Sequence, residues 1–369
     1  MTGVSGLGPW PGTEPLEAQQ TVLGDLADLR DGIDGLPWLV RLPDRGPFDT
    51  LAAADGLGLL VDLPAELGVH GWQLADRPGR DATRLAAQQR ERTDVLAIAG
   101  HGYAGPLVVP VCGPLTLAAS VYLARGDRAV GDAGATAEIV DSLAAGAVQH
   151  LAAVRRAVPG AEPVLLVHEP MLAQVVAGVL PTFSGYARLR AVPGPVAAER
   201  LGRFVTLLRD GGAGTVVVHV GTGTGVLPAV RSAGVDAVGL EVAGLDERRW
   251  EQVAEVVEQG TALWAQVPRP ATSQCAGPDV RGVADSVLVG WGRVGLERRR
   301  LRDVVLVAPG ATAVAAGAGA VGGGVGVPPG GPTAAGGAAG PSSSDAAQAR
   351  DVLATVARAA SLVAERAED

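Results

Sequence analysis

Short apolar runs recur along the chain and alternate with longer segments of helical pattern. The runs are rich in β-branched residues and lack polar alternation, which is typical of parallel strands buried on both faces. We expect strands at residues 3–8, 59–63, 107–113, 164–169, 215–220, 237–242, 262–267 and 304–309. Helices are expected at 137–158, 195–209, 246–258, 279–291 and 343–368. Ser343, Ser344 and Asp345 offer N-caps to the last of these helices.

This order of about eight strand–helix units predicts an α/β fold, a single (β/α)₈ TIM barrel over residues 1–369. The main competitor is an open, doubly wound sheet. It is disfavoured because no G-x-G-x-x-G turn follows the first strand.

One stretch interrupts this regular pattern. Residues 304–344 carry no charge, and beyond the last strand they are dominated by Gly and Ala, with several prolines. Glycine disfavours helix, so a membrane-spanning helix is not expected here. We therefore predict a low-complexity, flexible loop over residues 310–344, inserted before the last helix.

Composition narrows the partners and the compartment. Hydrophobic residues make up 47% of the chain, and 30 Lys plus Arg against 39 Asp plus Glu give a net charge of −9. This balance disfavours nucleic acid and membrane surfaces as partners and leaves a small-molecule substrate. The two cysteines cannot form a disulfide framework, and the N-terminal residues lack signal-peptide features. We expect a cytoplasmic protein; the sequence does not indicate its oligomeric state.

In a barrel of this kind, chemistry is confined to the carboxyl ends of the strands. Polar residues near the expected ends are therefore the candidates for a site. They are Ser5, Asp62, Glu66, Cys112, Thr116, His168, Glu169, His219, Glu241 and Cys275.

Several of these residues lie in short motifs that together resemble a known family. The motifs are Thr2-Gly3-Val4, Val111-Cys112-Gly113-Pro114-Leu115-Thr116, Val167-His168-Glu169-Pro170, Val217-Val218-His219 and Gly239-Leu240-Glu241. In order and strand placement they are similar to the C-terminal catalytic barrel of cobalamin-independent methionine synthase. That family belongs to a superfamily shared with uroporphyrinogen decarboxylase. The resemblance covers most of residues 2–309 and the last helix.

The resemblance implies a zinc ion that binds the homocysteine sulfur, which then takes a methyl group from 5-methyltetrahydrofolate. On this chain His219 and Glu241 match two of the metal ligands. Gly221 and Gly310 stand where the family has cysteine, so any zinc is expected to bind weakly or not at all. Cys275, expected after the seventh strand, is a weak candidate for a replacement thiolate.

The resemblance also implies roles for the remaining candidates. His168 and Glu169 are the candidate catalytic residues, and Ser5, Thr116 and Glu169 are candidate substrate-binding residues. His168 replaces a carboxylate of the family motif. Each residue also has a structural interpretation, such as a hydrogen bond to a neighbouring strand for His219 or an ion pair with an arginine for Glu241.

Three functions remain open at this point. The first is a methionine-synthase-like methyltransferase acting on homocysteine or a related thiol, with a degenerate zinc site. The second is a non-catalytic barrel that binds a small molecule or a protein. The third, a uroporphyrinogen-decarboxylase-like enzyme, is less favoured because no arginine-rich N-terminal loop is present.

Overall fold

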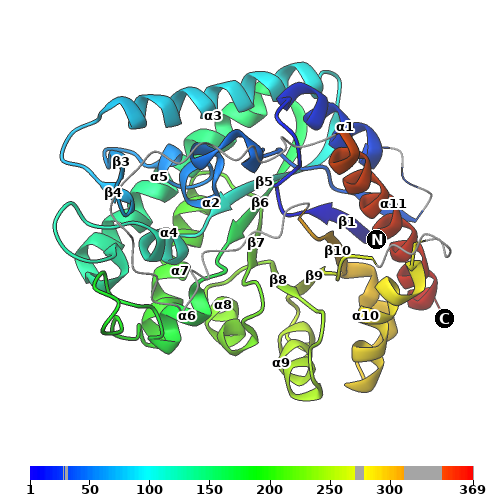
Figure 1. Ribbon diagram of the computed structural model, residues 1–369. Coiled ribbons are helices and arrows are strands. Elements are labelled where there is room, and N and C mark those ends of the chain that lie inside the picture. Colours follow the sequence, from blue (N-terminus) through cyan, green and yellow to red (C-terminus); the bar gives the residue numbers. More distant parts are fainter. Residues whose placement is uncertain (28, 30–31, 271–277, 311–342, 369) are drawn as a thin grey trace, which may run out of the picture.

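Eight parallel strands surround one axis, with helices packed outside them (Figure 1). The computed structural model describes residues 1–369 except 28, 30–31, 271–277, 311–342 and 369. The strands are β1 (Thr2–Gly6), β2 (Ile33–Gly35), β5 (Ala104–Cys112), β6 (Gly160–His168), β7 (Thr215–His219), β8 (Ala237–Glu241), β9 (Ala262–Gln266) and β10 (Val305–Ala308). Their order around the sheet is β2-β1-β10-β9-β8-β7-β6-β5. The expected (β/α)₈ TIM barrel is confirmed.

The two edge strands of this sheet, β2 and β5, meet beyond the end of β2. Trp38 and Val108 form a parallel bridge, and the Leu39 N–H donates to the Val108 carbonyl at 2.8 Å. The Val108 N–H donates in turn to the Pro37 carbonyl at 2.8 Å. These bonds bring the sheet close to a complete barrel.

Helices follow the strands in the order that the pattern predicts. The longer ones are α1 (Pro15–Ala27), α3 (Arg80–Ala99), α5 (Ala133–Ala157), α7 (Gly194–Asp210), α9 (Glu247–Glu258), α10 (Val280–Arg293) and α11 (Ser343–Glu368). Shorter helices are α2 (Leu51–Ala54), α4 (Pro114–Ser120), α6 (Leu172–Ala177) and α8 (Leu227–Ser232). All five expected helices are confirmed, with ends shifted by a few residues.

The strand expected at residues 59–63 is wrong. The second barrel strand is β2, and the segment after α2 instead forms a 3₁₀ turn, Leu57–Leu59, that lies against α5. The Ser142 hydroxyl on α5 bonds both the N–H (2.8 Å) and the carbonyl (2.6 Å) of Val61. At Gly146, also on α5, an added Cβ would overlap the Leu59 carbonyl. The apolar side chains of this segment are therefore buried by α5, on the outer side of the barrel.

As a consequence, Asp62 and Glu66 do not lie at the end of a barrel strand. Asp62 has a left-handed backbone conformation (φ 59°) in the loop that follows the 3₁₀ turn. Glu66 lies in a separate antiparallel hairpin of β3 (Ala65–Gly68) and β4 (Gly71–Leu74). There its carboxylate accepts a hydrogen bond from Gln73 at 2.6 Å.

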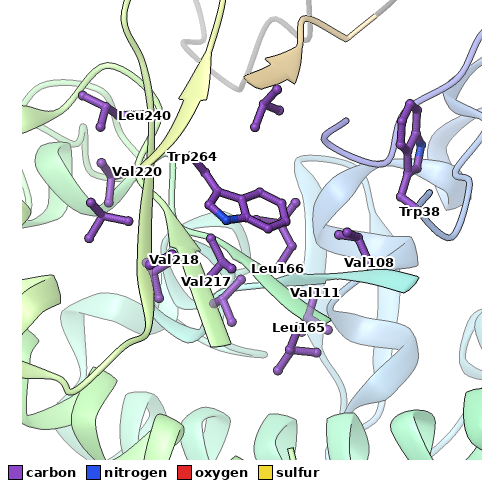
Figure 2. Close-up of a cluster of buried hydrophobic side chains, with 14 of the residues drawn as sticks. Trp38, Val108, Val111, Leu165, Leu166, Val217, Val218, Val220, Leu240 and Trp264 are labelled. Carbon is purple, nitrogen blue, oxygen red and sulfur yellow. The ribbon is translucent and has the colours of Figure 1, made fainter. Parts of the chain in front are cut away.

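The inside of the barrel is filled by large apolar side chains. Figure 2 shows the Trp264 ring of β9 lying among side chains that include Leu166 and Val217. Side chains two positions apart on a strand point the same way. His168 and His219 lie two residues after Leu166 and Val217, so they also point into the barrel, one layer nearer the carboxyl ends of the strands. The apolar side chains therefore lie directly below the polar residues at the strand ends.

Two sequence expectations fall outside the described part of the chain. Cys275 lies in residues 271–277, and nearly all of the 310–344 insertion lies in residues 311–342. Among the residues that are described, no helix combines the length and apolarity needed to cross a membrane.

Candidate functional site

A row of aligned residues crosses four neighbouring strands at their carboxyl ends. Cys112 of β5 is in register with His168 of β6, His168 with His219 of β7, and His219 with Gly239 of β8. Parallel neighbours in register point to the same face of a sheet, so the sequence-predicted histidines lie side by side. Their ring centroids are 6.0 Å apart.

His219 is held in one orientation by its surroundings. An added Cβ at Gly239 would lie 2.6 Å from the His219 Cδ2 atom, so glycine is needed for the ring to occupy this place. The Gly221 N–H donates to His219 Nδ1 at 3.3 Å. The imidazole is 3% exposed, and burial, followed by the proximity of His168, lowers its pKa to about 3. His219 is therefore neutral at pH 7.

His168 is also buried and neutral. Burial lowers its pKa to about 4, an effect that Arg41 adds to and that Asp55 and the Leu7 backbone oppose. Its Nε2 atom, like that of His219, is buried and has no hydrogen-bond partner within the described residues. Buried polar atoms are rarely left unpaired, so two of them on neighbouring rings, tilted by 61° to each other, make this pair the candidate site.

Glu169 immediately follows β6 and points towards α4. Its carboxylate accepts hydrogen bonds from the N–H groups of Leu115 (2.9 Å) and Thr116 (2.7 Å), at the start of that helix. The side chain is fully buried, and this burial raises its pKa to about 7 against the hydrogen bonds that lower it. Glu169 thus joins the end of β6 to α4 and has a protonation state that changes near neutral pH.

The two other candidate substrate-binding residues are buried and already have partners. The Ser5 hydroxyl donates to the Leu36 carbonyl at 2.9 Å, between β1 and the end of β2. The Thr116 hydroxyl accepts from the Met171 N–H at 3.2 Å. The first bond joins β1 to the segment after β2, and the second joins α4 to the segment after β6. Direct contact with a substrate stays a prediction for both residues.

The family's zinc ligands are only partly represented. Glu241 lies two residues beyond Gly239 on β8, so it is about 6–7 Å further along the strand direction than His219. Cys112 is fully buried, and burial raises the pKa of its thiol well above the usual value. No group of three His, Cys, Asp or Glu side chains suited to a metal ion is found among the described residues. These residues do not fit a zinc site of the family type.

A buried charged cluster beside His168 was not predicted from the sequence. Asp55, which follows α2, lies between two arginines, with Arg41 Nε and Arg92 Nη1 each 2.9 Å from one of its oxygens. The side chains of Arg41 and Asp55 are 3% and 1% exposed. The Asp55 carbonyl accepts from the Cys112 N–H at 2.6 Å, which ties the cluster to the end of β5.

A sequence signal for this cluster existed. Arg41 stands alone in the apolar run Trp38-Leu39-Val40-Arg41-Leu42, and Asp55 closes the run Ala52-Ala53-Ala54. A single charge inside an apolar run indicates a buried, paired group. The pairing itself depends on how α3 packs, which the sequence pattern does not reveal.

The mouth of the barrel on the β1 and β10 side is tight. A cavity of about 20 Å³ is lined there by residues that include Leu7, Trp10, Trp38 and Gly310. This volume is enough for about one water molecule.

The chain was compared with known proteins. No protein-family model and no curated protein matches the sequence. Among solved structures, the fold is similar to that of a B12-independent methionine synthase from Shewanella sp. W3-18-1 in complex with selenomethionine. The TM-score is 0.56 at 11% sequence identity, over 98% of this chain and 97% of that chain. The chain has a methionine-synthase-like barrel fold.

Proposed function

We propose that the chain is a methionine-synthase-like barrel that binds a sulfur-containing amino acid at the carboxyl ends of β6 and β7. Its activity would be methyl transfer from 5-methyltetrahydrofolate to homocysteine or a related thiol. The observation that carries the proposal is the pair of buried imidazoles at the carboxyl ends of the strands, each with an Nε2 atom that has no hydrogen-bond partner among the described residues. The end-to-end likeness in fold to a methionine synthase supports the choice of ligand.

The surrounding groups suit a binding site for a small polar ligand. His168 and His219 are neutral, so they offer hydrogen bonds without a fixed charge. Glu169 is fixed by α4, so its carboxyl can hold or release a proton at constant geometry. The charged cluster of Arg41, Asp55 and Arg92 lies near His168, whose pKa is influenced by Asp55 and Arg41. Zinc has no step in this scheme, because the described residues do not assemble its ligands.

A non-catalytic binding barrel is the second candidate. It is favoured by the same finding, that no group of three metal-ligating side chains gathers within the described ranges. Zinc activates the sulfur in the family, and this second candidate is a chain that binds the amino acid without such activation and without turnover.

Calorimetric titration with L-methionine, L-homocysteine and L-norleucine tests the binding. Norleucine has the same shape as methionine without the sulfur, so it is the matched control ligand. We expect the two sulfur amino acids to bind and norleucine to bind several-fold more weakly. Equal binding of all three, or none, contradicts the proposed ligand.

Turnover is tested separately by incubating the protein with homocysteine and 5-methyltetrahydrofolate and measuring methionine by mass spectrometry. The reaction is run with a chelator and, in parallel, with added zinc. Methionine formation supports the methyltransferase, whereas binding without product in both conditions selects the non-catalytic barrel.

A further inference from the structure

The hydrogen bonds of His219 determine where its proton lies. A neutral imidazole has one N–H donor and one acceptor nitrogen. The acceptor is Nδ1, because the Gly221 N–H donates to it at 3.3 Å. The proton is therefore on Nε2, the buried atom that no described residue hydrogen-bonds.

This arrangement leaves neither nitrogen of His219 ready for a metal ion. The Nδ1 lone pair is taken by the Gly221 N–H, and Nε2 has no lone pair while it carries the proton. Moving the proton to Nδ1 would place two N–H groups, those of His219 and Gly221, against each other. Gly239 leaves the space that the ring occupies here, since an added Cβ at that position would lie 2.6 Å from His219 Cδ2.

We propose that His219 is a hydrogen-bond donor to an electron-rich ligand atom, specifically the sulfur of the bound amino acid, rather than a zinc ligand. This inference rests on the proposed function for the identity of the ligand, but not for the position of the proton. His168 supplies the second polar atom of the site, since its Nε2 also has no hydrogen-bond partner in the part of the chain that the structure describes. A sulfur seated between the two rings contacts both imidazoles.

Nitrogen NMR of the histidine-labelled wild-type protein tests the proton position directly. Two-bond correlations between ring protons and nitrogens distinguish a protonated from an unprotonated nitrogen, and the His219→Gln variant identifies the His219 signals. We expect protonated Nε2 and unprotonated Nδ1, unchanged by one equivalent of Zn²⁺ alone. A protonated Nδ1, or a shift of His219 to a metal-bound form, overturns the inference.

Two variants then test the donor role in binding. Glutamine keeps an N–H donor near the position of Nε2 but replaces the imidazole, whereas His219→Leu has similar bulk and no donor. With L-methionine and a chelator, we expect His219→Gln to bind within about threefold of wild type and His219→Leu to lose about tenfold or more. Equal losses in the two variants contradict a donor role. If wild type binds no methionine, the proposed function fails, and the nitrogen spectrum alone decides the tautomer.

Discussion

Replacing Glu169 by glutamine tests how the burial of this carboxyl group, at the end of β6, affects the free energy of unfolding. The carboxyl is fully buried and accepts from two N–H groups of α4, at 2.9 and 2.7 Å. The Glu169→Gln side chain has only one acceptor oxygen, so one of these N–H groups loses its partner. An unpaired buried N–H costs about 1–3 kcal/mol, and we expect the variant to be less stable than wild type by that amount at about pH 5.

The difference in stability between wild type and Glu169→Gln should depend on pH. Burial raises the Glu169 pKa from its ordinary value of 4.5 to about 7, so between these pH values the carboxyl is protonated in the folded protein and ionised in the unfolded chain. A raised acid pKa gives stability that is present below the unfolded pKa and is lost as the pH rises through the folded pKa. With about 1.4 kcal/mol per pKa unit, wild type should lose roughly 2–3 kcal/mol relative to the variant between about pH 5 and pH 8.

Urea unfolding of both proteins across this pH range measures the effect. The matched control is Glu258→Gln, an exposed carboxyl at the end of α9, for which the difference from wild type should stay nearly constant. A constant difference for Glu169→Gln as well would show that the buried carboxyl ionises like an exposed one. That result would refute the reasoning from burial.

Three further perturbations test the packing and electrostatics around the site. Asp55→Asn removes the charge between two buried arginines and should cost about 3–5 kcal/mol in urea unfolding; a loss below about 1 kcal/mol would mean that the cluster is solvated. Gly239→Ala places a methyl group against His219 and should cost about 1–3 kcal/mol, whereas Gly225→Ala, with nothing within 4 Å, should cost much less; similar losses would contradict the close contact. His150 is buried with a pKa lowered to about 4, mainly by burial, so its contribution to stability is present above the unfolded pKa of 6.5 and is lost as the pH falls towards 4. His150→Gln should therefore flatten the acid limb of the stability profile, and an equally steep limb would show that this histidine titrates normally.

The barrel could be predicted because most of its strands can be recognised from their own residues. Seven of the eight expected strands are short runs without strong helical pattern, most of them rich in β-branched residues as in β6 and β7, and all seven are present in the structure. The exception is β2, which has only three residues, Ile33–Gly35, followed by a proline at position 37. So short a segment has no periodicity to detect, and the more apolar run at 59–63 took its place in the prediction.

The candidate site was predicted only in part, for a related reason. His168 and His219 end consecutive strands, so parallel topology alone brings them together. The ion pair of Asp55 with Arg92 joins residues 37 positions apart through the packing of α3. The orientation of Glu169 towards α4 likewise depends on the backbone conformation just after β6, which cannot be deduced from the types of the residues there. Tertiary contacts of this kind leave no periodic trace in the sequence.

The claim that a sulfur amino acid binds between the two histidines is tested most directly by soaking crystals with selenomethionine and measuring the anomalous scattering of selenium. The account predicts a selenium peak at the carboxyl ends of β6 and β7, within hydrogen-bonding distance of the Nε2 atoms of His168 and His219. Selenium bound elsewhere on the protein, or absent at saturating ligand, would contradict it.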